Sequence, residues 1–327
     1  MLSLLAGGIY YAYKHFSSLD PLKLNPQAVL NQLLEGRVPK QILGILGMSQ
    51  KLSQKVIPAD KQILGQSGVL FKFLLVADSH NDNNHLNKAI LQTKQTHPDI
   101  QFIIGLGDYS EVGTQDELQK VKKVFDGSGF RYFLLVGDHD LWDSRDKTQS
   151  PLNNFKQVFG PPYQSFSLNN FKFLLLYNSD NYLGMGEEQL NWLSLELEKA
   201  KTEGVKGIFV FVHEPLFHPS SDHVMGRVER KLKYQAKNLI YTLSQAGVNE
   251  QVRAFGTGGA FGTGGAFGTK VFAGDTHFFS EYREPETNLE MVTIGALTID
   301  RNPQTPRFAI VWVFEDGSTG VEDVEVK

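Results

Sequence analysis

The chain has 327 residues, a formal net charge of −4 and charged side chains at 21% of positions. This length can bury the core of one large domain or two ordinary ones, and the slightly acidic balance argues against a general nucleic-acid-binding protein, which needs a basic face. The absence of cysteine excludes disulfides, thiolate metal sites and cysteine nucleophiles, so any metal must bind through nitrogen and oxygen.

An apolar run occupies residues 2–13 and is followed by Lys14. The run is shorter than the roughly 20 residues that a bilayer span needs, and it has neither a basic leader region nor a small-residue cleavage site. Two interpretations stay open: a terminal helix packed on the protein, and a membrane contact that is part of an anchor. The compartment is therefore not identified, and the protein is either cytoplasmic or tethered to a membrane by its N-terminus.

Residues 15–66 have helical periodicity, with apolar residues at Leu30 and at the positions three and four further on. They carry no recognisable chemistry. We predict an N-terminal apolar segment and helical lead-in over residues 1–66, and a main domain over residues 67–327.

From Val69 onward, apolar runs typical of buried strands alternate with helical patterns, which predicts βαβ units and a largely parallel core. Five of the runs stop directly before Asp or His, alone or after Gly: Phe71–Ala77, Gln101–Leu106, Arg131–Val136, Gly207–Val212 and Lys270–Ala273. Because parallel strands end at the same edge of a sheet, where such sheets place their sites, we expect these polar residues to converge.

Other segments complete the predicted fold. We predict helices through Leu86–Ile90, Asp116–Phe125 and Leu190–Leu197, loop structure from Gly137 to Tyr163, a hairpin that turns at Asn169-Asn170, and strands within Met291–Ile299 and Phe308–Phe314. A hairpin and further strands that follow the parallel core along the chain indicate an α/β fold of two mixed sheets packed face to face, with helices outside.

Residues 254–269 repeat a Gly-rich unit with a six-residue period. The segment is too short for a solenoid. A phosphate-binding loop would lead into a helix with a Lys-Ser/Thr pair, whereas this segment leads into a strand. We interpret it as a low-complexity, flexible insertion.

The polar residues after the five strands follow a fixed order along the chain: Asp78-Ser79-His80, Gly107-Asp108, Gly137-Asp138-His139-Asp140, His213 and Gly274-Asp275-Thr276-His277. Each alone is more typical of a structural or solvated residue. At Asp78 and His80 we expect extended backbone to turn both side chains to one side. The complete set, with each member after an apolar strand, indicates a metal site.

This ordered set resembles the calcineurin-like metallophosphoesterase superfamily, whose pattern is Asp-x-His, Gly-Asp, Gly-Asn-His-Asp/Glu, His and Gly-His-x-His. The resemblance covers about residues 70–300. Phe159–Tyr163, Gln189–Leu193 and His213-Glu214-Pro215 are similar to the branch with class III cyclic-nucleotide phosphodiesterases and purple acid phosphatases. The resemblance implies a four-layer α/β/β/α sandwich and hydrolysis of phosphomonoesters or phosphodiesters by metal-bound hydroxide. The implied partner is a phosphate-ester small molecule.

The resemblance also implies a role for each matching residue. Asp78, His80 and His277 would bind one metal, Asp108 would bridge, Asp138, His213 and Asp275 would complete the second site, and His139 would stabilise the phosphoryl group or protonate the leaving oxygen. Two cations about 3.5–4 Å apart can hold the attacking and leaving oxygens of an in-line displacement.

Two positions depart from the family pattern: Asp138 stands where the family has Asn, and Asp275 where it has His. Because extra carboxylates favour harder ions, we expect two ions of Mn²⁺, Fe²⁺/Fe³⁺ or Mg²⁺ rather than Zn²⁺. Two alternatives stay open: a catalytically weak metal-binding or scaffold protein with a decayed second site, and a nuclease of the same superfamily. Nearby His218, His223 and Arg227 are expected to be structural or solvated.

Overall fold

The computed structural model describes residues 68–246 and 268–327, which lie in one compact unit, Leu64–Lys327. The predicted lead-in over residues 1–66, with its apolar run, and nearly all of the predicted insertion at 254–269 lie outside the described residues. The predicted division into two parts therefore stays a prediction. In the described part of the chain, no helix is both long and apolar enough to cross a membrane.

The first sheet has five strands in the spatial order β11-β10-β1-β2-β3. Their bounds are β1 Val69–Val76, β2 Phe102–Gly105, β3 Arg131–Leu134, β10 Arg307–Phe314 and β11 Thr319–Glu325. Strands β1, β2 and β3 are parallel, whereas β10 runs antiparallel to β1, and β11 to β10. The carboxyl ends of three neighbouring strands therefore lie at one edge.

The second sheet has six strands in the order β4-β5-β6-β7-β9-β8. Their bounds are β4 Gln164–Leu168, β5 Phe171–Leu175, β6 Gly207–Val212, β7 Thr269–Ala273, β8 Ser280–Arg283 and β9 Glu290–Thr293. The four central strands are parallel and the two edge strands antiparallel. The predicted hairpin is confirmed, since Asn169 and Asn170, with φ of 49° and 66°, form the tight turn between β4 and β5.

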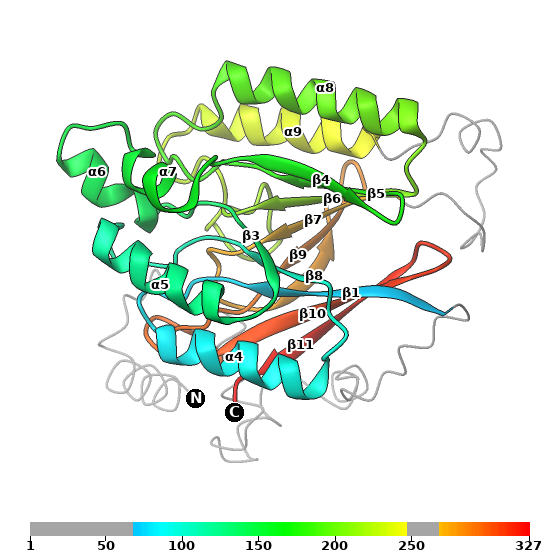
Figure 1. Ribbon diagram of the computed structural model, residues 1–327. Helices are drawn as coiled ribbons and strands as arrows, with labels where there is room; N and C mark the ends of the chain where they lie inside the picture. The colour runs from blue at the N-terminus through cyan, green and yellow to red at the C-terminus, as the bar shows by residue number, and fades with distance from the viewer. Residues whose placement is uncertain (1–67, 247–267) are drawn as a thin grey trace, which may run out of the picture. The chain divides into compact units, whose positions relative to one another are not determined.

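Helices cover the outer faces of both sheets, as Figure 1 shows. Their bounds are α4 Asn83–Thr96 and α5 Gln115–Gly127 beside the first sheet, and α8 Glu187–Glu203 and α9 Leu232–Ala246 beside the second. Buried apolar side chains form one cluster between the sheets and one under each helical layer. The predicted α/β/β/α sandwich of two mixed sheets is confirmed.

Two predictions about local structure were wrong. The segment predicted as loop from Gly137 to Tyr163 contains the 3₁₀ helix η2 (His139–Leu141) and the short helices α6 (Trp142–Asp146) and α7 (Asn153–Phe159). Helices this short show little periodicity and depend on tertiary packing. The run predicted as strand over Met291–Ile299 leaves the sheet after Thr293.

Phenylalanine rings fill the space between the sheets. Phe73 on β1 is fully buried, and its ring centroid lies 5.2–6.3 Å from five other rings. These rings belong to Phe102, Phe173, Phe209, Phe211 and Phe272. Interlocked rings hold the two sheets in one register, which keeps the adjoining strand ends in place.

We expect Phe73→Ala to lower the free energy of unfolding by about 3–5 kcal/mol, because it removes the ring from a site enclosed by both sheets. Urea denaturation followed by circular dichroism measures this loss. Leu195→Ala, at a side chain that is 63% exposed on α8, is the matched control and should change stability little. Equal losses in the two variants would contradict the proposed role of the ring layer.

Candidate metal centre

The polar residues predicted to converge come together at the carboxyl ends of the parallel strands. Asp78, Asp108 and Asp138 follow the neighbouring strands β1, β2 and β3, and His213 and Asp275 follow the neighbouring strands β6 and β7. Their side chains form overlapping groups whose potential ligand atoms lie within 4.8 Å of one another. The structure therefore unites residues that are almost two hundred positions apart, while their role as ligands stays a prediction.

The backbone at this edge is left-handed rather than extended, which corrects the expectation for Asp78 and His80. The φ angles are 52° at Asp78, 42° at His80, 52° at Asp108, 62° at Asp275 and 60° at His277. A left-handed non-glycine residue costs about 1–2 kcal/mol, so the surrounding structure must hold it. The sharp turns send each chain back across the sheet edge and leave the side chains on a common side.

Two glycines allow the turns after β2 and β3 to touch. A Cβ atom on Gly137 would lie 2.1 Å from both the backbone nitrogen and Oδ1 of Asp108, and one on Gly107 would lie 2.6 Å from the backbone nitrogen of Gly137. No other residue fits at these distances. The Gly of each Gly-Asp pair is thus required by the close contact of the two turns.

One group consists of Asp78, His80 and His277. The Nε2 atoms of His80 and His277 lie 3.3 Å apart, and His80 Nε2 lies 3.5 Å from Asp108 Oδ2. Burial, together with the charges of the neighbouring histidines, lowers the pKa of His80 to about 2. His80 is therefore a neutral imidazole, the form that binds metals.

A second group consists of Asp138, His213 and Asp275. His213 Nδ1 donates to the carbonyl oxygen of Leu106 at 2.8 Å, which leaves Nε2 facing Asp108 Oδ1 at 3.4 Å and Asp138 Oδ1 at 3.5 Å. His213 Nε2 is buried and has no hydrogen-bond partner. A cation bound between this nitrogen and the carboxylate oxygens would give each of these atoms a partner.

The electrostatics of the site also fit divalent cations. Burial raises the pKa of the Asp108 carboxyl well above its usual value, and the charges of Asp138, Asp140 and Asp78 raise it further, although His213 opposes them. Carboxylates crowded in a buried site repel one another unless positive charge lies between them. Carboxylate oxygens and imidazole nitrogens are donors that divalent metal ions accept in proteins.

Asp140 and His139 tie the two Gly-Asp turns together. Asp140 Oδ1 accepts from the backbone nitrogens of Tyr109 and Ser110, both at 3.1 Å, and its Oδ2 accepts from Gly137 at 3.0 Å. The backbone nitrogen of His139 donates to Asp108 Oδ1 at 3.0 Å. The His139 ring stacks on Trp142 with centroids 3.8 Å apart, which fixes its orientation at the rim of the site.

Two asparagines that we did not single out position the second group. Asn181 donates to Asp138 Oδ2 at 2.9 Å, and Asn178 Oδ1 accepts from the backbone nitrogens of His213 at 3.0 Å and Glu214 at 3.2 Å. Both follow β5, a parallel strand in the middle of its sheet that does not end on Asp or His. A strand end is the only sequence signal that could have found them.

Of the weaker candidates, His223 and Arg227 lie beside the second group. His223 Nδ1 is 3.9 Å from Asp275 Oδ1, and Arg227 Nη1 is 2.9 Å from His223 Nε2. His218 instead packs on Tyr282, with ring centroids 4.6 Å apart, and is structural as expected.

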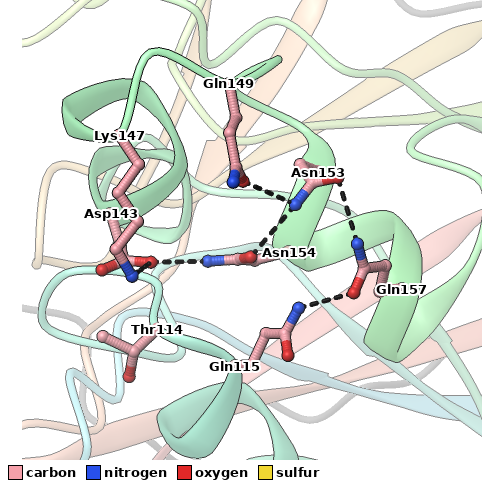
Figure 2. A pocket seen from close by; sticks show the side chains of 8 residues that line it. All are labelled: Thr114, Gln115, Asp143, Lys147, Gln149, Asn153, Asn154 and Gln157. Carbon is pink, nitrogen blue, oxygen red and sulfur yellow. Dashed lines mark hydrogen bonds and ion pairs between the residues drawn. The ribbon is translucent and has the colours of Figure 1, made fainter.

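A polar hollow of about 330 Å³ lies beside the site but contains none of the predicted ligands (Figure 2). Five of its eight lining residues carry side-chain amides: Gln115, Gln149, Asn153, Asn154 and Gln157. Asp143, which also lines it, directly follows the Trp142 that stacks on His139. The hollow therefore adjoins the rim of the site through α6.

Comparison with known families agrees with this geometry. A sequence model of the calcineurin-like phosphoesterase family matches residues 71–243, more than half of the chain. The chain belongs to this family. Membership of this family implies two divalent metal ions. The matched segment contains the Gly107-Asp108 and Gly137-Asp138 turns and His213. The residues after β7, Asp275 and His277, lie beyond the matched segment.

The individual proteins that match share little sequence identity with this chain. The serine/threonine-protein phosphatase CPPED1 of Rattus norvegicus is 28% identical over 148 residues, or 41% of this chain and 46% of that protein. The Mus musculus protein of the same name is 27% identical over 149 residues, with the same shares. The chain thus spans about half the length of the curated relatives that it matches.

A solved structure supports the fold. The purple acid phosphatase PPD1 from Lupinus luteus superposes with a TM-score of 0.54 and 13% identity, over 80% of this chain and 52% of that chain. At this identity the likeness concerns the architecture alone.

We expect manganese to raise the melting temperature of the protein, because ions that bind only the folded state stabilise it by about 2.7 kcal/mol at a hundredfold excess over Kd. Asp108→Asn should raise the melting temperature without metal, since it removes one buried charge, and should lose most of the manganese-dependent rise. Differential scanning fluorimetry with and without EDTA measures both effects. Asp146→Asn, at an exposed carboxylate, should behave as the wild type. A full manganese response in Asp108→Asn would contradict the site.

Proposed function

We propose that the protein hydrolyses phosphate monoesters with two metal ions held by Asp78, His80, Asp108, Asp138, His213, Asp275 and His277. The observation that supports this most is the presence of two groups of three residues next to Asp108. In each group, Asp78, His80 and His277 or Asp138, His213 and Asp275, the potential ligand atoms lie within 4.8 Å of one another. The names of the rat and mouse relatives, serine/threonine-protein phosphatases, favour monoesters over diesters.

The chain's own residues would share the chemistry with the ions. Two divalent ions acidify a bound water and neutralise charge on the transferring phosphoryl group. His139 lies at the rim, with Nδ1 donating to the carbonyl oxygen of Glu111 at 2.7 Å. That bond leaves Nε2 to hold a proton for the leaving oxygen, as a general acid does. Trp142 keeps the ring in place by stacking.

Carboxylates crowd the second site. Asp138 and Asp275 add negative charge where the family pattern has neutral residues, and Glu214, only 4% exposed, lies next to His213. Burial, together with the nearby charge of Asp275, raises the pKa of Glu214 to about 8. We propose manganese, magnesium or iron rather than zinc, because oxygen-rich sites favour harder ions.

We expect His139→Ala to lower kcat for para-nitrophenyl phosphate by about 10²- to 10⁴-fold, the usual contribution of a general acid. Steady-state kinetics with Mn²⁺, Fe²⁺, Mg²⁺ and Zn²⁺ in turn measures the loss. The control is His97→Ala, whose ring packs on Trp312 on the first sheet, outside the site. Unchanged kcat in His139→Ala would remove His139 from the mechanism.

The metal preference has its own test. Asp138→Asn restores the family residue and removes one carboxylate, so the second site should shift toward zinc. Metal analysis by inductively coupled plasma mass spectrometry of wild type and variant, purified side by side, measures the shift. Stoichiometric zinc in the wild type would contradict the proposed preference.

A scaffold that keeps the fold but has little activity is the second candidate, and the added carboxylates at Asp138 and Asp275 are the feature that favours it. Turnover of para-nitrophenyl phosphate, its bis-ester and a phosphoserine peptide separates the candidates. A folded protein that is inactive with every metal and substrate would favour the scaffold. Preference for the bis-ester would favour a phosphodiesterase, and cleavage of DNA a nuclease.

A further inference from the structure

An ion pair outside the predicted ligand set joins two loops at the site. The guanidinium of Arg301, between β9 and β10, binds the carboxylate of Glu111, between β2 and α5. The two residues are 190 positions apart. Both side chains are partly exposed, at 55% for Arg301 and 41% for Glu111. By exposure alone this pair would contribute little to stability.

Three imidazoles of the site nevertheless turn Nδ1 toward these two residues. Nδ1 of His139 lies 2.7 Å from the Glu111 carbonyl oxygen, and Nδ1 of His277 lies 3.1 Å from the Arg301 carbonyl oxygen. Because a carbonyl oxygen only accepts, each of these rings must carry a proton on Nδ1. Nδ1 of His80 lies 3.6 Å from Glu111 Oε2 and is buried with no hydrogen-bond partner.

The backbone around Arg301 is arranged to present its carbonyl oxygen. Arg301 has a left-handed φ of 57°, which is unfavourable for a residue with a side chain. Asn302 holds the loop by donating to the carbonyl oxygens of Ala296 at 3.1 Å and Thr298 at 2.8 Å. The backbone nitrogen of Thr298 in turn donates to the backbone carbonyl oxygen of Asp78 at 3.0 Å. The loop is thus tied to the predicted ligands at both ends.

We propose that the Glu111–Arg301 ion pair is a positioning device that keeps His80, His139 and His277 protonated on Nδ1 and so leaves their Nε2 atoms for the metal centre and the substrate. With this tautomer, the lone pairs of His80 and His277 face each other across 3.3 Å, an arrangement that a cation between them satisfies. Ring nitrogens opposite a metal are commonly held in this way by carboxylates and carbonyl groups. The link to metal binding rests on the proposed function, whereas the predicted positions of the protons on the three rings do not.

The test compares Glu111→Ala and Arg301→Ala with Arg283→Ala. Arg283 forms an equally exposed ion pair with Glu290 on the edge of the second sheet, so its loss reports only what a surface pair contributes. Arg301→Ala keeps the carbonyl group that His277 uses and removes only the guanidinium. Glu111→Gln keeps an oxygen that can accept from His80 and should rescue part of any effect.

Long-range ¹H–¹⁵N spectra of ¹⁵N-histidine protein without metal report the tautomer of each ring, with assignment by single His→Gln variants. In the wild type and in Arg283→Ala we expect a proton on Nδ1 of all three rings, and in Glu111→Ala and Arg301→Ala a mixture of the two neutral tautomers for His80. Calorimetric titration with Mn²⁺ should show a 10- to 100-fold weaker affinity in the latter two.

The outcomes separate the two proposals. The positioning role would be overturned if Glu111→Ala and Arg301→Ala had the same tautomers and Mn²⁺ affinities as Arg283→Ala. A wild-type protein that binds no metal would overturn the proposed function, while the spectra would still decide the tautomers. Changed tautomers at similar melting temperatures would establish the positioning role, because general loosening of the fold would lower the melting temperature as well.

Discussion

Concentrated buried negative charge is the constraint on which the rest of this structure depends. Asp78, Asp108 and Asp138 lie at the ends of three neighbouring strands and are at most 9% exposed. Such a cluster is unfavourable in a metal-free protein, so the sandwich must hold it together by other means. Those means are the phenylalanine layer between the sheets and the carboxylate of Asp140, which accepts hydrogen bonds from both Gly-Asp turns.

The two sheets contribute differently to the site. The first sheet supplies most of the carboxylates, and the second supplies His213 and the loop with Asp275 and His277. Contacts between backbone and imidazole join them, such as the bond from His213 Nδ1 to Leu106 at the end of β2. If these residues bind metal as proposed, a ligand set divided in this way forms only when the sheets are packed, and metal binding is coupled to completion of the fold.

Strand ends were the part of the molecule that the sequence could predict. Five apolar runs that stop at Asp or His identified the core strands and the converging residues, because burial on both faces of a sheet leaves continuous apolar sequence. The short helices after β3 were missed because their stability comes from packing rather than periodicity. Glu111 and Arg301 were missed because their roles rest on contacts between loops, which leave no pattern in the chain. Asn178 and Asn181 were missed because they lie a few residues beyond the end of β5 rather than directly after it.

The contact between Gly107 and Gly137 limits how this centre can change over evolution. Since the turns of Asp108 and Asp138 touch through backbone atoms, their separation cannot be adjusted by substituting side chains. Sequence change around the site is therefore accommodated more easily at its perimeter, in segments such as α6, α7 and the stretch that carries His223 and Arg227. Those surfaces can diverge freely while the reactive centre between them stays unaltered.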